Sequence, residues 1–189
     1  MPWRDVPAFV KRHVAEFKQG EATRAALLFL ILTAARSGEV RGATWDEFDL
    51  KAGVWTIPGE RMKAKEQHRV PLSSAALELV KRLKEQKLHE TLAFPSPRQK
   101  VLSDMVLTSF LRRVKAPSDT PRRVATAHGF RSSFRDWASE HGYARDLAER
   151  ALAHTIANKT EAAYHRSDLM EQRRPMMQKW AAHVRGINV

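Results

Sequence analysis

The spacing of apolar positions along the chain predicts a mainly helical protein. The segment Glu21–Ala35 is apolar on nearly every side, which is typical of a helix buried in a core. Phe9–Phe17 is expected to form a short helix, and Gly38 is expected to break the long one just after Arg36. Further helices are predicted after a serine cap at Ser73, after a serine cap at Ser103, and over roughly residues 127–141, 144–153, 158–165 and 168–184.

A second pattern, with a period of two, indicates a small sheet. Gly53–Pro58 alternates and is rich in β-branched and aromatic residues, so it is predicted as a strand. Arg61–Pro71 is its expected hairpin partner, with a polar turn at Ala64–Gln67. Trp45–Leu50 is predicted as a turn leading into the strands, and Thr91–Phe94 as a further short strand. The expected fold class is therefore mainly α, with one small antiparallel sheet inserted after the buried helix (α+β).

Composition adds a strong positive charge to this picture. The chain of 189 residues has the length of one domain, or of one domain with a tail, and its formal net charge is +12. The part from Pro95 onward holds 17 basic and 9 acidic residues, against 16 and 12 before it. Such a surface suits nucleic acid, because phosphate neutralisation releases counterions. The alternative is a basic protein without a polyanionic partner.

Several classes of function are disfavoured. The absence of cysteine excludes disulfides and thiolate metal sites and makes the cytoplasm the natural compartment. The longest apolar run, Ala25–Ala35, is too short to span a bilayer, and no secretory signal follows Met1. The carboxylates form no convincing metal-binding pattern, and no phosphate-binding glycine loop occurs, so neither a metal nor a nucleotide cofactor is expected.

Candidate chemistry begins on the helix predicted at residues 127–141. His128 and Arg131 are three residues apart and project the same way, with Arg135 one turn further along. The opposite face carries apolar residues at core spacing, namely Phe130, Phe134 and Trp137. The helix is thus predicted to have a packing side and a cationic side. The alternative is a solvated face with a chance histidine.

An arginine upstream has the same character. Arg36 ends a run of apolar or small residues, so its stem starts inside the protein and its charge needs a partner. Glu39, three residues on, is the obvious candidate. The pair is either a structural ion pair or a device by which Glu39 orients Arg36 towards a phosphate, and the two interpretations are compatible.

The remaining candidates complete a set suited to phosphodiester chemistry without a metal. His154 is either a structural histidine or a hydrogen-bond donor to phosphate. Tyr164 sits beside charged residues rather than in core company, and a phenol attacks well only near positive groups or a base. Lys63 and Lys65, on the hairpin turn, are either solvated or able to protonate a leaving oxygen.

The ordered set Arg36, a hairpin lysine, His128-x-x-Arg131, His154 and Tyr164 resembles the tyrosine recombinases, and within them the phage and genomic-island integrases. The resemblance extends over nearly the whole chain. The stretches that carry it are 35–40, 68–73, 127–131, 152–168 and 171–177. It implies the DNA breaking-rejoining catalytic fold.

The resemblance also implies roles. Arg36 and Arg131 would clamp the non-bridging oxygens of the scissile phosphate, and Tyr164 would attack phosphorus to form a 3′-phosphotyrosyl link. His128 would assist proton transfer at the tyrosine, and His154 would hydrogen-bond the phosphate.

Two further roles concern the leaving group and Arg36. The spacing to the following strand favours Lys63 over Lys65 as general acid for the departing 5′-hydroxyl. Glu39 would support Arg36.

At the level of the whole protein the resemblance implies site-specific recombination of double-stranded DNA by a homo-tetramer in the cytoplasm of a bacterial or phage-infected cell. Residues 1–189 are expected to be a catalytic domain with residues 168–189 as a tail helix, and without the family's core-binding and arm-binding domains. A non-catalytic DNA-binding module and a type IB topoisomerase are the alternatives.

Overall fold

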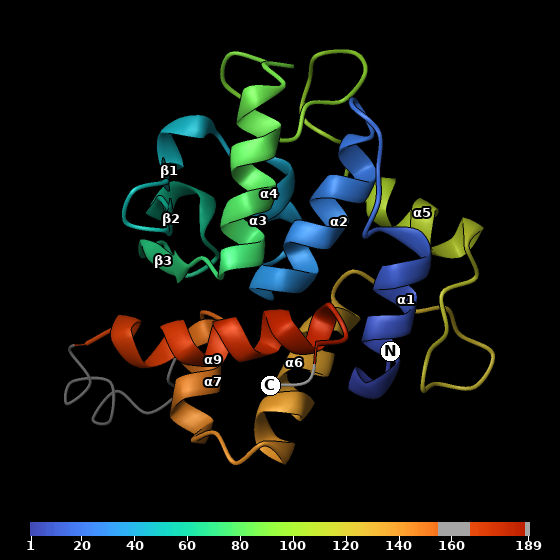
Figure 1. Ribbon diagram of the computed structural model, residues 1–189, viewed down its shortest axis with the longest axis vertical. Helices are drawn as coiled ribbons and strands as arrows, with labels where there is room; N and C mark the ends of the chain where they lie inside the picture. Colours follow the sequence, from blue (N-terminus) through green and yellow to red (C-terminus); the bar gives the residue numbers. More distant parts are fainter. Residues whose placement is uncertain (155–166, 188–189) are drawn as a thin grey trace.

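The computed structural model describes residues 1–154 and 167–187, so the helix expected at residues 158–165 and Tyr164 itself lie outside the described residues. Helices dominate the described parts (Figure 1). The α-helices are α1 (Val6–His13), α2 (Ala22–Thr33), α3 (Ser37–Arg41), α4 (Ser74–Glu85), α5 (Val106–Arg113), α6 (Gly129–Glu140), α7 (Arg145–Ala151) and α9 (Met170–Val184), with short 3-10 turns η1 (Trp3–Asp5), η2 (Trp45–Glu47) and η3 (Gly59–Arg61).

The sheet has three antiparallel strands in the order β1-β2-β3. These are β1 (Phe48–Asp49), β2 (Val54–Ile57) and β3 (His68–Pro71). The strand predicted at 53–58 is confirmed, whereas only the last four residues of the predicted partner, 61–71, are strand. Residues before them form η3 and a turn. The predicted fold class, mainly α with a small antiparallel sheet, is confirmed.

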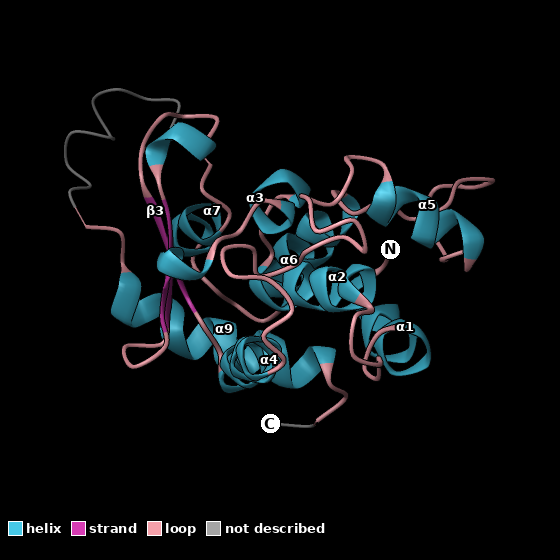
Figure 2. Cartoon of the chain, turned by 90° about the horizontal axis from the view of Figure 1, so that it is seen from above, coloured by secondary structure: helices cyan, strands magenta, loops and turns pink. Residues whose placement is uncertain are grey.

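One apolar core joins the helices to the sheet. Phe29 of α2 lies against Trp55 of β2 and Phe94, with ring centroids 5.2 and 5.4 Å apart. Two residues further along α2, Trp180 of α9 is fully buried and donates from Nε1 to the carbonyl of Ile31 at 2.7 Å. Figures 1 and 2 both show α9 running beneath α4 and beside the strands. The buried helix predicted at 21–35 is therefore the centre of the molecule.

The end of that helix differs from the prediction. α2 stops at Thr33 because Ala34 adopts a left-handed conformation, with φ of 52°. Gly38 does not break a helix, since it lies within α3. The turn at residues 34–36 instead separates two helices and leaves Arg36 in an extended conformation between them.

Of three further predicted helix starts, one is confirmed and two are wrong. Ser73 caps α4 as predicted, its Oγ accepting from the Ala76 N–H at 3.3 Å. Ser103 does not cap α5, which begins at Val106 after Met105 and has no side-chain cap. The first helix lies at 6–13 rather than 9–17, because Pro7 is accepted at a helix start.

Two predicted boundaries of the sheet also change. The strand expected at 91–94 is reduced to an isolated bridge between Leu92 and Thr44. The turn expected at 45–50 contains strand β1, whose Phe48 pairs with Trp55. None of the helices described is long and apolar enough to cross a membrane.

Candidate active site

Arg36 is fixed by the helix that follows it. It is the extended N-cap residue of α3, with φ of −78° and ψ of 148°. The buried carboxylate of Glu39 accepts from the Arg36 backbone N–H at 2.8 Å and from the guanidinium Nη1 at 2.8 Å. The first contact is the reciprocal half of a capping box and the second is the predicted ion pair, so one carboxylate sets both backbone and side chain.

Arg131 lies inside the protein rather than on a cationic face, which corrects the prediction for α6. Its side chain is only 3% exposed. Nη1 donates to the carbonyl of Ala34 at 2.6 Å and Nη2 to the carbonyl of Leu152 at 2.5 Å. These carbonyls end α2 and α7, where helices leave acceptors without partners and carry partial negative charge. The Arg131 guanidinium donates to both carbonyls. The periodicity of the sequence does not reveal these contacts, because they join elements far apart in the chain.

The two arginines meet at one turn. Arg36 Nη2 donates to the carbonyl of Ala153 at 3.0 Å, and Arg131 holds the carbonyl of the preceding residue, Leu152. The next residue is His154. Ala153 has a left-handed φ of 49°, which directs the chain out of α7 at this point. Guanidinium groups from opposite halves of the sequence thus converge beside a histidine.

His128 completes the cluster at the start of α6. Burial, followed by the positive charges of Arg131, Arg36 and His154, lowers the pKa of His128 below its usual value. Burial, followed by the charge of Arg36, lowers the pKa of Arg131 to about 10. At neutral pH the arginine therefore keeps its charge while the imidazole of His128 is mostly neutral and able to accept a proton.

His154 is held by a pair of residues that the sequence did not single out as a unit. Its Nδ1 shares a hydrogen bond with Glu149 Oε2, and Glu149 Oε1 accepts from Arg135 Nε at 2.8 Å. Burial alone would raise the pKa of Glu149, but the hydrogen bonds from Arg135 and His154 outweigh it and hold that pKa below its usual value. The sequence signal that could have revealed this support is Glu149 on α7, which precedes His154 by five residues. A carboxylate at this place can orient the imidazole and fix its tautomer.

The hairpin lysines are exposed on the turn between η3 and β3. Neither the Lys63 nor the Lys65 ammonium group makes a hydrogen bond or ion pair with any described residue, whereas the Lys65 backbone N–H donates to the Met62 carbonyl at 3.1 Å. The turn itself is held closely, because a Cβ on Gly59 would lie 2.6 Å from the Lys65 carbonyl oxygen. A groove of about 180 Å³ runs between this turn and α7, lined by residues that include Met62, His68 and His154.

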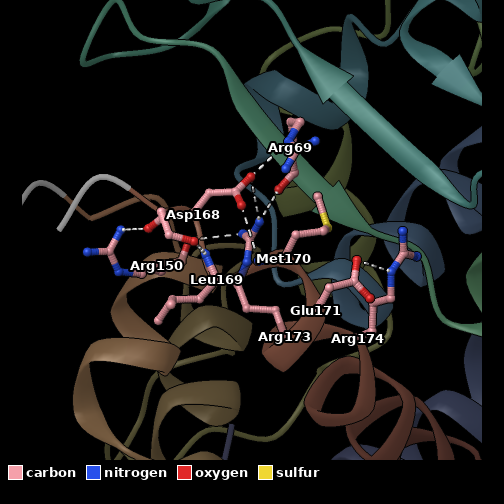
Figure 3. Close-up of polar contacts among 9 residues, drawn as sticks. Arg69, Arg150, Asp168, Leu169, Met170, Glu171, Arg173 and Arg174 are labelled. Atoms are coloured by element: carbon pink, nitrogen blue, oxygen red, sulfur yellow. Dashed lines mark hydrogen bonds and ion pairs between the residues drawn. The ribbon is translucent and has the colours of Figure 1, made fainter.

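An ionic network around the buried Arg173 borders the same groove, just after the residues that the structure does not describe (Figure 3). Asp168 Oδ2 accepts from Arg69 Nε at 2.8 Å and lies 3.7 Å from Arg173 Nη2. Asp168 Oδ1 accepts the Met170 N–H at 3.1 Å. Arg150 Nη1 donates to the Ser167 carbonyl at 2.6 Å. The network ties the start of α9 to β3 and α7.

Of the predicted site residues, the structure brings together Arg36, Glu39, His128, Arg131 and His154. Lys63 lies on the turn beside the groove, and Tyr164 lies outside the described residues. Within residues 1–154 and 167–187 no group of three or more histidine, cysteine, aspartate or glutamate side chains is placed to hold a metal ion.

The fold and this cluster define a class of protein. The chain superposes on the XerH site-specific recombinase bound to difH with a TM-score of 0.65 (20% identity, 88% of this chain and 53% of that chain). It superposes on the lambda integrase catalytic core with a TM-score of 0.56 (19% identity, 83% and 90%). A lambda integrase tetramer on a Holliday junction gives 0.57 (19% identity, 88% and 46%). The fold is that of tyrosine recombinase catalytic domains.

Sequence similarity then gives the family. A model of the phage integrase family matches residues 5–171, and the chain belongs to that family. Prophage integrase IntA of Escherichia coli (strain K12) is 39% identical over 167 residues, covering 87% of this chain and 39% of that protein. The integrase of Enterobacteria phage P4 is 37% identical over 200 residues, covering 97% and 45%. The chain spans less than half the length of these relatives.

Proposed function

We propose that this chain catalyses strand cleavage and rejoining in site-specific recombination of duplex DNA, through a 3′-phosphotyrosyl intermediate at Tyr164. The observation that carries the proposal is the meeting of two guanidinium groups at the consecutive carbonyls of Leu152 and Ala153, directly before His154. Membership of the phage integrase family and the net charge of +12 support it.

The arginines provide the site for the scissile phosphate. A guanidinium has five N–H donors, and the two carbonyl bonds of Arg131 use two of them. The remaining donors and the fixed positive charge suit the non-bridging oxygens, whose charge grows as phosphorus is attacked. Arg36 is 26% exposed, whereas Arg131 is nearly buried, so Arg36 takes the larger share of direct contact in this conformation.

Proton transfer at the nucleophile falls to His128. A phenol with a pKa near ~10 attacks slowly unless its proton is removed or its anion is stabilised. The lowered pKa of His128 leaves it neutral and able to accept that proton. The nearby arginines favour the phenolate. The Tyr164 oxygen then forms the bond to phosphorus as the bond to the 5′-oxygen breaks.

His154 and Lys63 act on the other side of the phosphate. Glu149 occupies Nδ1 of His154, which leaves Nε2 for a phosphate oxygen. Lys63 delivers a proton to the departing 5′-hydroxyl, with Lys65 the second choice on the same turn. The exposed, unpaired ammonium groups of this turn can reach a DNA backbone lying over the groove.

Chain length keeps the nucleophile within reach. Tyr164 is four residues before Asp168, so its Cα lies within about 14 Å of the Asp168 Cα in any conformation. Asp168 and His154 line the same groove. Because Asp168 lies at this groove, Tyr164 is close enough in the chain to reach the phosphate held by the arginines.

We further propose that the working assembly is a homo-tetramer on two DNA duplexes in the bacterial cytoplasm, with no metal or nucleotide cofactor. The phosphotyrosyl link conserves the energy of the broken bond, so a 5′-hydroxyl from another duplex can reverse the step. The lambda integrase neighbour is a tetramer on a Holliday junction, and it supports this assembly.

The proposal is tested with duplexes nicked just 3′ of a fixed phosphate and randomised around it. Attack on that phosphate releases a short 5′-hydroxyl fragment that diffuses away, which traps the covalent complex. Incubation with the purified chain is expected to give an adduct stable to denaturation, and sequencing the captured DNA gives the preferred site. Tyr164→Phe is expected to bind the same DNA and to form no adduct.

Tyr143→Phe is the matched control, because Tyr143 is the other tyrosine of the chain and packs against Trp137. It is expected to leave the adduct intact. Binding of duplex DNA without any adduct, at protein concentrations that saturate the library, would contradict the proposal and favour a non-catalytic DNA-binding module.

A further inference from the structure

The strand that follows the lysine turn is anchored at its first residue. His68 begins β3, opposite Ile57 in the register with β2. Its side chain is partly buried and lines the groove together with His154, and the backbone carbonyl of Ala151 at the end of α7 acts on its pKa as a hydrogen-bond acceptor. One imidazole thus bridges the lysine hairpin and the turn that presents His154.

The neighbouring residue is anchored as well. Arg173 Nη2 donates to the carbonyl of Arg69 at 2.7 Å, and Arg69 Nε donates to Asp168 at 2.8 Å (Figure 3). Arg173 Nη1 reaches the carbonyl of Arg150 on α7 at 3.4 Å. The start of β3 is therefore joined to α7 and α9, while the turn ahead of it stays exposed.

The surroundings of His68 favour a neutral imidazole. Arg173, Arg36 and Glu39 are the charged groups that act on His68. Burial, followed by the charge of Arg173, lowers the pKa of His68 to about 4, although Glu39 and the Ala151 carbonyl oppose the shift. A neutral imidazole can donate to the carbonyl without adding another positive charge beside two arginines.

We propose that His68 is a positioning residue that holds the hairpin turn so that Lys63 reaches the leaving 5′-oxygen of the phosphate bound beside His154. The inference rests on the proposed function. His68 itself contacts neither phosphate nor nucleophile. It acts by fixing the point, five residues after Lys63, at which the exposed turn rejoins the sheet. A flexible lysine on an unanchored turn would spend less time near the leaving group.

Replacement of the leaving oxygen by sulfur separates this role from a general structural one. In a duplex with a bridging 5′-sulfur, the Tyr164 oxygen forms its bond to phosphorus while the phosphorus–sulfur bond breaks. The sulfur departs with the electron pair as a thiolate. A thiol has a pKa near ~8.5, so the leaving group needs no proton and the step no longer depends on a general acid.

The experiment measures single-turnover adduct formation on the captured duplex in its oxygen and sulfur forms. His68→Phe keeps a ring and removes the donor, and it is expected to be at least ~10-fold slower than the unmodified chain on oxygen but equal to it on sulfur. His68→Gln, which retains an N–H donor, is expected to recover part of the rate on oxygen. Full rate on sulfur also shows that the variant is folded and binds DNA.

Lys63→Ala is run beside it, with Lys65→Ala as the matched lysine control. Rescue of Lys63→Ala by sulfur together with equal slowing of His68→Phe on both substrates overturns the role of His68 alone. An undiminished rate of His68→Phe on oxygen also overturns it. Failure of sulfur to rescue Lys63→Ala overturns the lysine assignment in the proposed function.

Discussion

Single side chains at the site hold the backbone as well as supply its positive charge. Arg131 links the last carbonyls of α2 and α7, and Arg36 binds the carbonyl that follows. Lysine cannot replace this fork, because an ammonium lacks the planar set of donors that spans two carbonyls. The positive charge at the site is thus fixed by groups that the fold needs.

His68 gives a residue-scale prediction about pH. Its pKa is about 4 in the folded chain and near ~6.5 in the unfolded chain, so between these values the unfolded chain binds more protons. The free energy of unfolding therefore falls as the pH drops from about 6.5 to 4, and His68 contributes roughly 2 kcal/mol of that loss by pH 4.5. Urea titrations at pH 7 and 4.5 are expected to show a smaller loss in His68→Phe.

The other histidines do not affect this comparison of the pH dependence of stability between the unmodified chain and His68→Phe. Burial is the first cause that lowers the pKa values of His13, His128 and His183, and these groups titrate in both proteins. The difference between the two pH dependences belongs to His68. The same loss of stability in both proteins would show that His68 is not held in its neutral form.

At the scale of elements, the left-handed turn at Ala34 explains how one helix ends and another begins around Arg36. The prediction placed this break at Gly38, because glycine is the usual breaker. The actual break uses an alanine with φ of 52°, whose carbonyl is held by Arg131 from a helix distant in sequence. A local pattern does not contain that contact.

Gly38→Ala tests the reassignment. Gly38 lies in α3 without a positive φ, and an added Cβ would meet only Arg41 Nη2 at 4.0 Å. Alanine is more favourable than glycine inside a helix, so the variant is expected to gain about 0.5–1 kcal/mol in the free energy of unfolding, measured by urea titration.

Gly142→Ala is the matched control. Its added Cβ would meet no atom within 4 Å, but its φ of +74° disfavours any side chain, so a loss of about 1 kcal/mol in the free energy of unfolding is expected. Destabilisation of Gly38→Ala to the same degree would return Gly38 to the role of a helix breaker.

At the scale of the molecule, periodicity was enough for the fold class and for most helices. Phe130, Phe134 and Trp137 are buried as their spacing predicted, and the alternating strand at 53–58 is present. The resemblance of the ordered motif supplied the list of candidate site residues. It could not supply the burial of Arg131, nor the support of His154 by Glu149, because both depend on contacts between elements far apart in the chain.

The whole site also depends on α9. This helix packs on α2 through Trp180 and on β3 through Arg173, so it closes the core behind the groove. A tail helix was expected at residues 168–189; the helix observed there, α9, packs into the core of its own chain. The arginine cluster and the lysine hairpin are held by one continuous body.

The account is tested most directly by locating the DNA-linked amino acid. After nuclease and trypsin digestion of the adduct, the two tyrosines fall in different peptides, 160–166 with Tyr164 and 136–145 with Tyr143. Tandem mass spectrometry is predicted to find a nucleotide 3′-phosphate on Tyr164. A nucleotide on Tyr143, or on any serine, threonine or histidine, would contradict the central claim.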